Sequence, residues 1–399
     1  MTNVLMVSAY FWEPPKKYYG VYWTAVNLRR RGHRVVAISS RIHDSRESEV
    51  IEGVHIYRVP AFYLSRIPWA IAFPGNLWNY LRNIIEQYKI QMVHLQELAF
   101  PCAFLTALYC RRKHLPYVVT SHGAYFGLGW GFVPDVMLDL YVLVFGRLTL
   151  RFAEKVAAIS KGQIPILSKL GVPKEKIVFT PLGINTDTSI FRKATERDRI
   201  EARKRLNLAE EDFVVGFVGR LAPDKNVNLL LESAGILKEK IRNLKLVIVG
   251  SGVEEEMLRR KTIQLGLESS VSFLGWREDI DKILPAMDVF AFPSLSDGLG
   301  RAFVEAMTMG VPVVSTDVPG PASVIANGEN GLLVPRDNTS AMADGILRLY
   351  KDEQLRSKLS ARGASVNQVF SWEFCMLKLE AMYEEVLKSN NLQTLKAGV

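Results

Sequence analysis

Two acidic residues stand on either side of a short glycine-containing stretch in the sequence SDGLGRAFVEAMTMG. Asp297 and Glu305 are separated by seven residues, which include Gly298, Gly300 and Arg301. A helix that begins near Gly300 leaves backbone N–H groups uncovered at its N-terminus, and such groups bind an anion. Because an acid beside an anion is repelled, we expect each acid to have another ligand. Glu305 could accept hydrogen bonds from two vicinal hydroxyls, as a ribose offers, and Asp297 could face a sugar ring.

Two cations follow another apolar run. After DFVVGFVG the chain continues RLAPDKNV, so Arg220 and Lys225 lie on one predicted strand-to-helix loop, with Lys225 at the start of the helix. A guanidinium and an ammonium side by side suit a diphosphate, since Arg binds in a bidentate manner and Lys acts as a point charge. The alternative is that both are solvated loop cations.

The N-terminal half contributes two further candidates. Gly20 opens a predicted helix, where a glycine lets a phosphate approach the free N–H groups, although a plain turn glycine is the alternative. His122 follows the apolar run PYVVTSH, where a neutral imidazole could bond a substrate hydroxyl or carbonyl. A structural histidine is the alternative there. The patterns GxGxxG and GxxxxGK[ST] are absent, so the nicotinamide and P-loop classes lose their main support.

The candidate site residues must be positioned by strands and helices. Short apolar runs that alternate with helix-like segments predict these elements. Continuous apolar runs of this length are typical of parallel strands buried on both faces. Two such series predict two doubly wound α/β domains, whose ligands bind at the carboxyl ends of the strands. The predicted strands fall at residues 3–10, 34–40, 91–96, 116–122 and 154–160 in the first series, and 212–219, 244–250, 270–275, 288–294 and 311–317 in the second.

Charge is distributed unevenly along the 399 residues, a length that also favours two domains. Residues 1–190 hold 22 Lys and Arg against 12 Asp and Glu, whereas the remainder holds 28 against 29. The basic half therefore predicts contact with an anion, such as a membrane surface or a phosphorylated substrate; solubility alone is the alternative. We expect no nucleic-acid partner, because the basic residues are scattered and form no known binding motif.

Cysteines and apolar runs indicate the compartment. Three cysteines without zinc-site spacing give neither a disulfide framework nor a metal site, which fits a reducing cytoplasm. The N-terminus reads as a first strand and not as a signal peptide. The uncharged run at residues 67–81, which contains two prolines and a glycine, is shorter than the roughly 20 residues that span a bilayer. We therefore expect a cytoplasmic protein, either soluble or peripheral on the inner face of the cell membrane.

The chain resembles the retaining GT-B glycosyltransferases of family 4, the group 1 glycosyltransferases, which use nucleotide sugars. The resemblance covers nearly the whole chain and is carried in order by VGRLAPDKNV, FLGWREDI, AFPSLSDGLGRAFVEAMTMGVPVVSTDVPG and NGENGLLVP. It implies two Rossmann-like domains facing across a cleft. Residues 1–188 would form the acceptor-side domain and residues 189–370 the donor domain, and a helix at 371–390 would pack back on the first.

The resemblance also implies roles for individual residues. Arg220 and Lys225 would hold the donor diphosphate and steady the leaving nucleotide. Glu305 would bind the ribose hydroxyls, Asp297 would contact the donor sugar near its reacting face, and His122 would lie near the transferred sugar. The remaining implied donor-site residues are Gly20 beside the diphosphate, Gly298, Leu299, Gly300 and Arg301 in the loop near the sugar phosphate, and Trp276 and Arg277 against the base.

Three positions depart from the family pattern. The acidic motif usually begins with Glu, and here it begins with Asp297. The first-domain turn is commonly Gly-Gly, and here it is Tyr19-Gly20. An acid often found near Ser323 is absent.

The implied function is the retaining transfer of a hexose from a UDP- or GDP-sugar to an acceptor hydroxyl. The acceptor would be a glycolipid, a lipid-linked molecule or a polysaccharide precursor of the cell envelope. Neither a metal nor another cofactor is implied, because protein cations neutralise the diphosphate. The alternatives are a GT-B protein that binds a nucleotide sugar without transferring it, or an epimerase on the same fold.

The acceptor is expected on the first domain. Seven aromatic residues between Tyr57 and Tyr80, together with the basic excess, would suit an interfacial site near an anionic membrane; burial in the core is the alternative. The glycine-containing segment 124–134 would be a mobile acceptor loop.

Overall fold

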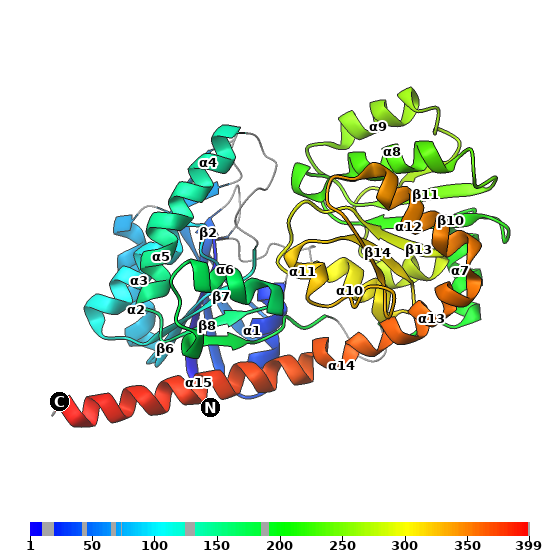
Figure 1. Ribbon diagram of the computed structural model, residues 1–399. Coiled ribbons are helices and arrows are strands. Elements are labelled where there is room, and N and C mark those ends of the chain that lie inside the picture. The colour runs from blue at the N-terminus through cyan, green and yellow to red at the C-terminus, as the bar shows by residue number, and fades with distance from the viewer. Residues whose placement is uncertain are drawn as a thin grey trace. The chain divides into compact units, whose positions relative to one another are not determined.

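The computed structural model describes residues 1–9, 20–41, 46–64, 69–72, 74–123, 132–184 and 191–397. These residues divide into two compact units, shown in Figure 1. The N-terminal unit contains the described residues up to Gly183 and those from Trp372 onward, and the C-terminal unit contains the described residues from Ile184 to Ser371. Each unit has its own sheet and its own hydrophobic core.

The N-terminal unit is built on a sheet of nine strands within the described residues, in the order β3-β4-β2-β1-β6-β7-β8-β9, with β5 paired to β4. β3 and β5 run antiparallel to β4, and the other pairs are parallel. The chain winds outward from β1 in both directions, which is the doubly wound topology. The strands are β1 (Asn3–Val7), β2 (Arg34–Arg41), β3 (Ser48–Ile51), β4 (Val54–Leu64), β5 (Trp69–Ala72), β6 (Met92–Leu95), β7 (Tyr117–Ser121), β8 (Lys155–Ala158) and β9 (Ile177–Phe179).

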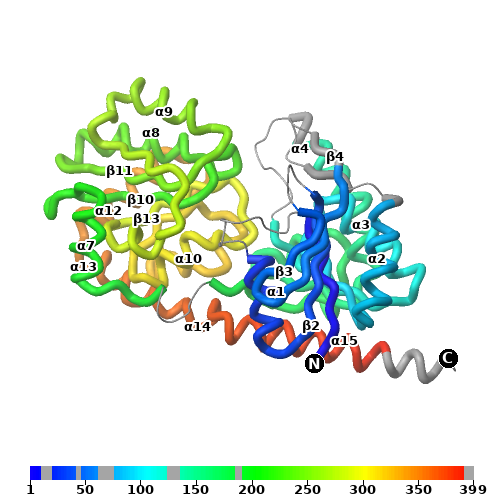
Figure 2. The backbone as a smooth tube through the Cα atoms, turned by 180° about the vertical axis from the view of Figure 1, so that it is seen from behind, coloured from blue at the N-terminus to red at the C-terminus, as the bar shows by residue number. Residues whose placement is uncertain are grey.

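Helices cover this sheet, and the last of them comes from the far end of the chain. α15 (Trp372–Ala397) lies in the same unit as β2, as the reverse view in Figure 2 also shows. Its Leu379, Met382 and Tyr383 are buried in one cluster with residues of α1 and of the central strands. The other helices are α1 (Gly20–Arg30), α2 (Pro74–Tyr88), α3 (Pro101–Lys113), α4 (Phe132–Tyr141), a π-helical turn (Val142–Gly146), α5 (Arg147–Arg151) and α6 (Ile164–Lys169). Of the helices that the structure describes, none is long and apolar enough to cross a bilayer.

The C-terminal unit has a parallel sheet in the order β12-β11-β10-β13-β14-β15. Its strand order reverses between β10 and β13, so this pair forms the topological switch point. The strands are β10 (Phe213–Val218), β11 (Leu244–Val249), β12 (Val271–Phe273), β13 (Val289–Phe292), β14 (Val313–Thr316) and β15 (Leu332–Val334).

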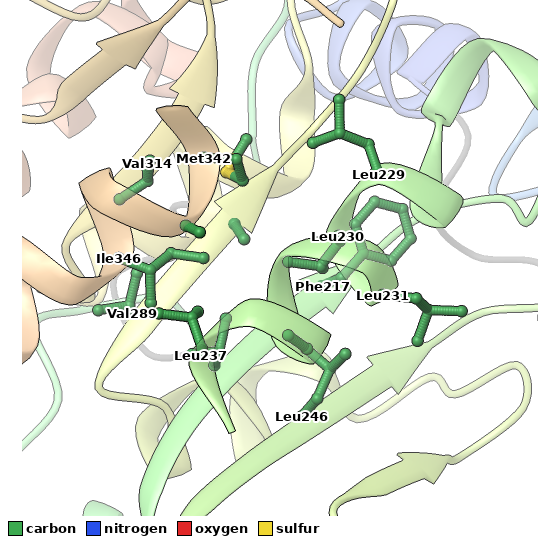
Figure 3. Close-up of a cluster of buried hydrophobic side chains, with 14 of the residues drawn as sticks. Phe217, Leu229, Leu230, Leu231, Leu237, Leu246, Val289, Val314, Met342 and Ile346 are labelled. Carbon is green, nitrogen blue, oxygen red and sulfur yellow. The ribbon is translucent and has the colours of Figure 1, made fainter. Parts of the chain in front are cut away.

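A core of aliphatic side chains joins the helices of the C-terminal unit to its sheet. Leu230 of α8 and Ile346 of α12 pack with Phe217, Leu246 and Val289 of the central strands, as drawn in Figure 3. The helices of this unit are α7 (Glu196–Arg205), α8 (Val227–Leu237), α9 (Glu255–Gln264), α10 (Arg301–Thr308), α11 (Pro319–Ala322), α12 (Thr339–Lys351), α13 (Glu353–Gly363) and α14 (Asn367–Phe370).

The doubly wound α/β architecture predicted from the alternating pattern is confirmed in both units, and each of the ten predicted strands overlaps an observed one. One detail was wrong: Lys225 does not start α8. It ends a 3₁₀ turn (Pro223–Lys225), and Asn226 then adopts a left-handed conformation with a φ of 47° before α8 begins. Asn tolerates this conformation better than most residues, so it separates the turn from the helix.

Candidate active site

Six of the twelve predicted site residues lie on two loops at the switch point of the C-terminal sheet, and two more, Arg301 and Glu305, lie on the helix α10 that follows the second loop. Arg220 and Lys225 follow β10, and Asp297 and Gly300 follow the neighbouring strand β13. The two loops are tied together at the carbonyl of Asp224, which accepts hydrogen bonds from the backbone N–H of Leu295 (2.9 Å) and from the Ser294 hydroxyl (2.8 Å). In open α/β sheets this is where ligands bind.

An ion pair connects the two loops. The Lys225 Nζ donates a hydrogen bond to Asp297 Oδ2 and lies 3.4 Å from Asp224 Oδ2. Burial by itself would lower the pKa of Lys225, but the charges of Asp297 and Asp224 outweigh it, so the pKa is raised. Lys225 therefore remains an ammonium and supplies a fixed positive charge at the switch point.

Arg220 is held at the rim of the same cluster. Its Nη2 donates to both carboxylate oxygens of Asp224, at 3.2 and 3.0 Å. Asp224 is buried, whereas the Arg220 side chain is 60% exposed, so the guanidinium is anchored at one edge and open to a ligand at the other. Asp224 was missed by the sequence analysis. The signal for it was an acid between the two predicted cations in RLAPDK.

The loop before α10 requires glycine at its last position. Gly300 has a φ of 83°, and a Cβ there would lie 2.7 Å from Phe303 and 2.9 Å from Phe292. Asp297 fixes the start of the loop: its Oδ1 accepts from the Leu299 N–H at 3.2 Å, and its carbonyl accepts from the Gly320 N–H at 3.1 Å. The loop thus leads directly into α10. The free backbone N–H groups at the N-terminus of this helix would favour the binding of an anion.

Glu305 lies one helical turn after Arg301 on α10, and the two interact at 3.4 Å (Nη2 to Oε1). Glu305 is buried. Burial raises the pKa of its carboxyl, and Arg301 opposes this with a smaller effect. A buried carboxylate with one cationic neighbour retains acceptor capacity for further donors, such as hydroxyl groups.

Trp276 and Arg277 follow β12, an outermost strand, which lies two strands from β10. Because the sheet is parallel, both residues lie at the same carboxyl end of the strands as Arg220 and Lys225. The Trp276 side chain is exposed. Arg277 pairs with Asp279 at 2.7 Å and not with the acids of the switch-point cluster. The structure thus places both residues on the predicted edge but shows no direct contact between them and Arg220 or Lys225 among the described interactions.

The two candidates of the N-terminal half lie in the N-terminal unit, where β7 and α1 position them. His122 follows β7, and its Nε2 lies 3.0 Å from Oε1 of Gln96, a buried residue that follows β6. His122 and Gln96 also border a cavity of about 20 Å³. Gly20 begins α1, and a Cβ there would lie 2.4 Å from Leu182 Cδ2, so packing contributes to the need for glycine. Tyr19 and most of segment 124–134 lie outside the described residues.

No group of three or more His, Cys, Asp or Glu side chains is arranged to hold a metal ion in the part of the chain that the structure describes.

Two doubly wound units, with cations and acids at the switch point of the second, define the GT-B class of proteins. Solved structures agree with this assignment of the fold. The sucrose-phosphate synthase of Thermosynechococcus elongatus is 20% identical and covers 98% of this chain and 100% of its own, with a TM-score of 0.82. Anabaena HepE in complex with UDP is 20% identical, with coverage of 96% and 99% and a TM-score of 0.76.

Sequence comparisons identify the family within that class. Residues 198–366 match the family model described as glycosyl transferases group 1, and residues 19–183 match the glycosyl transferase 4-like domain. A putative glycosyltransferase of Bacillus subtilis, EpsD, is 30% identical over 75% of this chain and 78% of its own length. The capsular polysaccharide biosynthesis glycosyltransferase CapM of Staphylococcus aureus is 30% identical over 60% of this chain and 63% of its own. The chain belongs to the group 1 glycosyltransferases.

Proposed function

We propose that the protein transfers a hexose from a nucleoside diphosphate sugar to an acceptor hydroxyl, with retention of the anomeric configuration. The cluster of Arg220, Asp224, Lys225 and Asp297 at the switch point is the observation that supports this most directly. It offers two cations to a diphosphate, beside an acid that can accept hydrogen bonds from a sugar.

The cluster suggests how the donor would be bound. Lys225 is partnered by Asp297 in the structure. A diphosphate oxygen would be a second anionic partner for the same ammonium, with Arg220 and the N-terminal N–H groups of α10 as further donors. With Lys225 shared in this way, the Asp297 carboxylate has capacity to accept hydrogen bonds from the sugar hydroxyls. Glu305 would accept from the ribose hydroxyls.

The reaction breaks the bond between the anomeric carbon and the phosphate oxygen, and it forms a bond between that carbon and the acceptor oxygen. Negative charge develops on the departing diphosphate, where Lys225, Arg220 and the α10 N-terminus stabilise it. The acceptor hydroxyl approaches on the same face of the sugar, and its proton passes to an oxygen of the leaving phosphate. His122 would contact the transferred sugar, and these steps use neither a metal nor another cofactor.

The acceptor is proposed to be a lipid-linked or polysaccharide precursor of the cell envelope, reached by a cytoplasmic protein at the inner face of the membrane. Two observations support this choice. The described relative CapM is named for capsular polysaccharide biosynthesis. The whole basic excess of the chain also lies within residues 1–190, which suits an anionic surface.

A panel of UDP- and GDP-sugars tests the donor assignment. One nucleotide sugar is expected to raise the melting temperature of the wild-type protein, because a ligand that binds only the folded state stabilises it by mass action. Glu305→Ala is expected to weaken this response. If no member of the panel binds the wild-type protein, the assignment fails. Binding without transfer to any acceptor would instead favour the non-catalytic alternative.

Lengthening the first acid is expected to change the choice of donor sugar. Asp297→Glu moves the carboxylate about 1.5 Å, one C–C bond, beyond the position set by Lys225 and the Leu299 N–H. An added methylene typically alters discrimination between substrates by about 10- to 200-fold. We therefore expect the ratio of kcat/KM between two sugars on the same nucleotide to shift by at least about tenfold. An equal loss for every sugar would show that Asp297 does not select among them.

Donor binding is expected to weaken at acid pH because of Glu305. Its pKa is raised by burial, so the carboxylate takes up a proton at a pH above the ordinary Glu value of 4.5, and donor KM rises as the pH falls through that point. Glu305→Gln should abolish this limb of the pH profile and lower kcat/KM at neutral pH by about 10- to 100-fold.

The effect of Glu305→Gln on stability distinguishes a loss of donor binding from unfolding of the variant. An acid whose pKa is raised in the folded state destabilises the fold when it is ionised, above that pKa. Glu305→Gln should therefore melt no lower than the wild type at neutral pH. A variant that melts markedly lower, or one that keeps the acid limb, would contradict the role given to Glu305.

A further inference from the structure

The helical segment from α4 to α5 presents an unusually apolar surface. Within residues 135–151, the exposed side chains are apolar except for Arg147 and Arg151. Leu140 is 62% exposed. We call these side chains the α4–α5 apolar face; they are Val136, Met137, Leu140, Leu143, Val144, Phe145 and Leu148. Contiguous exposed apolar groups of this number are rare on monomeric proteins and usually mark an interaction site.

The apolar face continues onto α3 and ends at a group of cations. Phe104 of α3 packs edge-on against Phe145, with 4.9 Å between the ring centroids, and Leu108 is exposed one turn further along the helix. One more turn along, the Arg111 guanidinium lies 3.8 Å from the centroid of the Phe152 ring, which Arg151 also approaches at 5.7 Å. Arg112 and Lys113, which follow on α3, are exposed as well.

The charge around the apolar face has one dominant sign. Residues 101–151 contain five Lys and Arg against two Asp and no Glu. One of the acids, Asp139, is only partly exposed, and its Oδ1 is buried. Within this segment the exposed Lys, Arg, Asp and Glu side chains are therefore Arg111, Arg112, Lys113, Arg147 and Arg151.

We propose that the α4–α5 apolar face docks this protein on an anionic lipid surface, with the helices lying flat in the interface. Interfacial helices bind by burying one apolar face to the depth of the headgroups, while adjacent cations attract anionic lipids. Pairing with a second copy of the chain is less favourable. A two-fold interface would bring the same arginines and lysine of both copies together, and the face offers no acidic residues to pair with them. The proposal rests on the proposed function in one respect: docking would bring the protein to a lipid-linked acceptor.

The proposed docking surface consists of other residues than the aromatic ones between 57 and 80 that the sequence suggested. Of the aromatic residues between 57 and 80, the side chains of Tyr57, Trp78 and Tyr80 are described, and all three are partly buried. The Tyr57 hydroxyl lies 2.7 Å from that of Tyr88, and Trp78 Nε1 donates to the Leu105 carbonyl at 3.2 Å. Phe62, Tyr63, Trp69 and Phe73 have side chains outside the described part.

Vesicle flotation of the full chain tests the proposal, with vesicles of a neutral phospholipid and of the same lipid mixed with an anionic one. We expect the wild type to float with the anionic vesicles at low salt and to be released by high salt. The triple variant Leu140→Gln, Leu143→Gln, Val144→Gln should lose at least about tenfold in vesicle affinity, because each change removes an inserted apolar group. Arg147→Gln with Arg151→Gln should lose roughly tenfold on anionic vesicles alone.

A matched triple control exists in the C-terminal unit, where three aliphatic side chains are at least as exposed: Ile200, Val253 and Ile263. Their replacement by Gln should leave flotation unchanged. Folding of each variant is checked by circular dichroism. As a second readout, brominated lipid should quench the fluorescence of Leu140→Trp more than that of the wild type.

Two results would overturn the docking proposal. One is flotation of the apolar-face triple variant equal to that of the wild type. The other is a wild-type dimer that this variant converts to a monomer without any loss of flotation, which would assign the face to a second copy. Donor-induced thermal shifts, measured on the same proteins, keep the two proposals separate. Absence of any shift in the wild type contradicts the proposed function, whereas normal shifts with unchanged flotation contradict the docking surface alone.

Discussion

Replacing Lys225 with alanine is expected to lower turnover of the nucleotide-sugar donor by about 10²–10³-fold. The ammonium is held at the switch point by Asp297 and Asp224, and its raised pKa keeps it charged. Charge that develops on the leaving diphosphate would therefore lose its buried cationic partner, while Arg220 stays at the exposed rim. The rate of nucleoside diphosphate release at saturating donor measures this effect directly.

A control variant separates the site effect from a general loss of positive charge. Lys351, at the end of α12, is an exposed lysine of the same unit. Lys351→Ala is expected to retain the wild-type turnover. Near-normal kinetics in the Lys225→Ala variant, with its fold intact, would remove the diphosphate assignment.

Replacing Asp288 with alanine is expected to destabilise the C-terminal unit by about 3–5 kcal/mol, the cost of leaving buried charge without its partner. Asp288 precedes β13 and accepts hydrogen bonds from Arg199 (2.6 Å), from Arg203 (2.8 Å) and from the Val214 N–H (2.7 Å). Arg203 is buried and also donates to backbone carbonyls of the α7–β10 connection, so it cannot turn to solvent without breaking them.

Native-state hydrogen exchange of the β10 and β13 amides measures this loss, because it reports the free energy of opening for those strands. Asp344, an exposed acid on α12, is the matched control, and Asp344→Ala should leave the exchange unchanged. Equal protection in the wild type and the Asp288→Ala variant would show that the buried ion pairs do not anchor α7 to the sheet.

Ten of the fifteen strands in the described part of the chain were predicted, because buried parallel strands read as short apolar runs. FVVGFV and VFAF are such runs, and the glycine-containing loops that follow them identified the switch-point residues. β3 was not predicted, since SEVI pairs antiparallel at the sheet edge and alternates in burial without forming an apolar run. Edge strands carry a weaker sequence pattern because one side faces solvent.

The contacts within the site were not predictable from spacing. Asp297 lies 72 positions from Lys225 in the sequence, and only the parallel pairing of β10 with β13 brings the two loops together. The apolar helix α4 illustrates the same limit. Its composition suits a buried helix, and whether such a face is covered depends on the neighbours that the tertiary fold provides.

The short first acid of the motif now has a structural context. Asp297 bridges Lys225 of one loop and the Leu299 N–H of its own, so its length is matched to two partners. The site residues of the C-terminal unit are therefore arranged around Lys225, which has two carboxylate partners. A donor diphosphate would have to share this lysine with them.

The central claim is that this cluster cleaves a nucleoside diphosphate sugar. Proton NMR of the reaction of each donor in the UDP- and GDP-sugar panel with an acceptor extract tests it most directly, since it reports both donor consumption and the anomeric configuration of the new bond. We expect the wild type to consume one donor and to form a product with the donor's configuration, while Lys225→Ala leaves that donor intact over the same period. Inversion of the configuration, or equal consumption by the wild type and Lys225→Ala, would contradict the account.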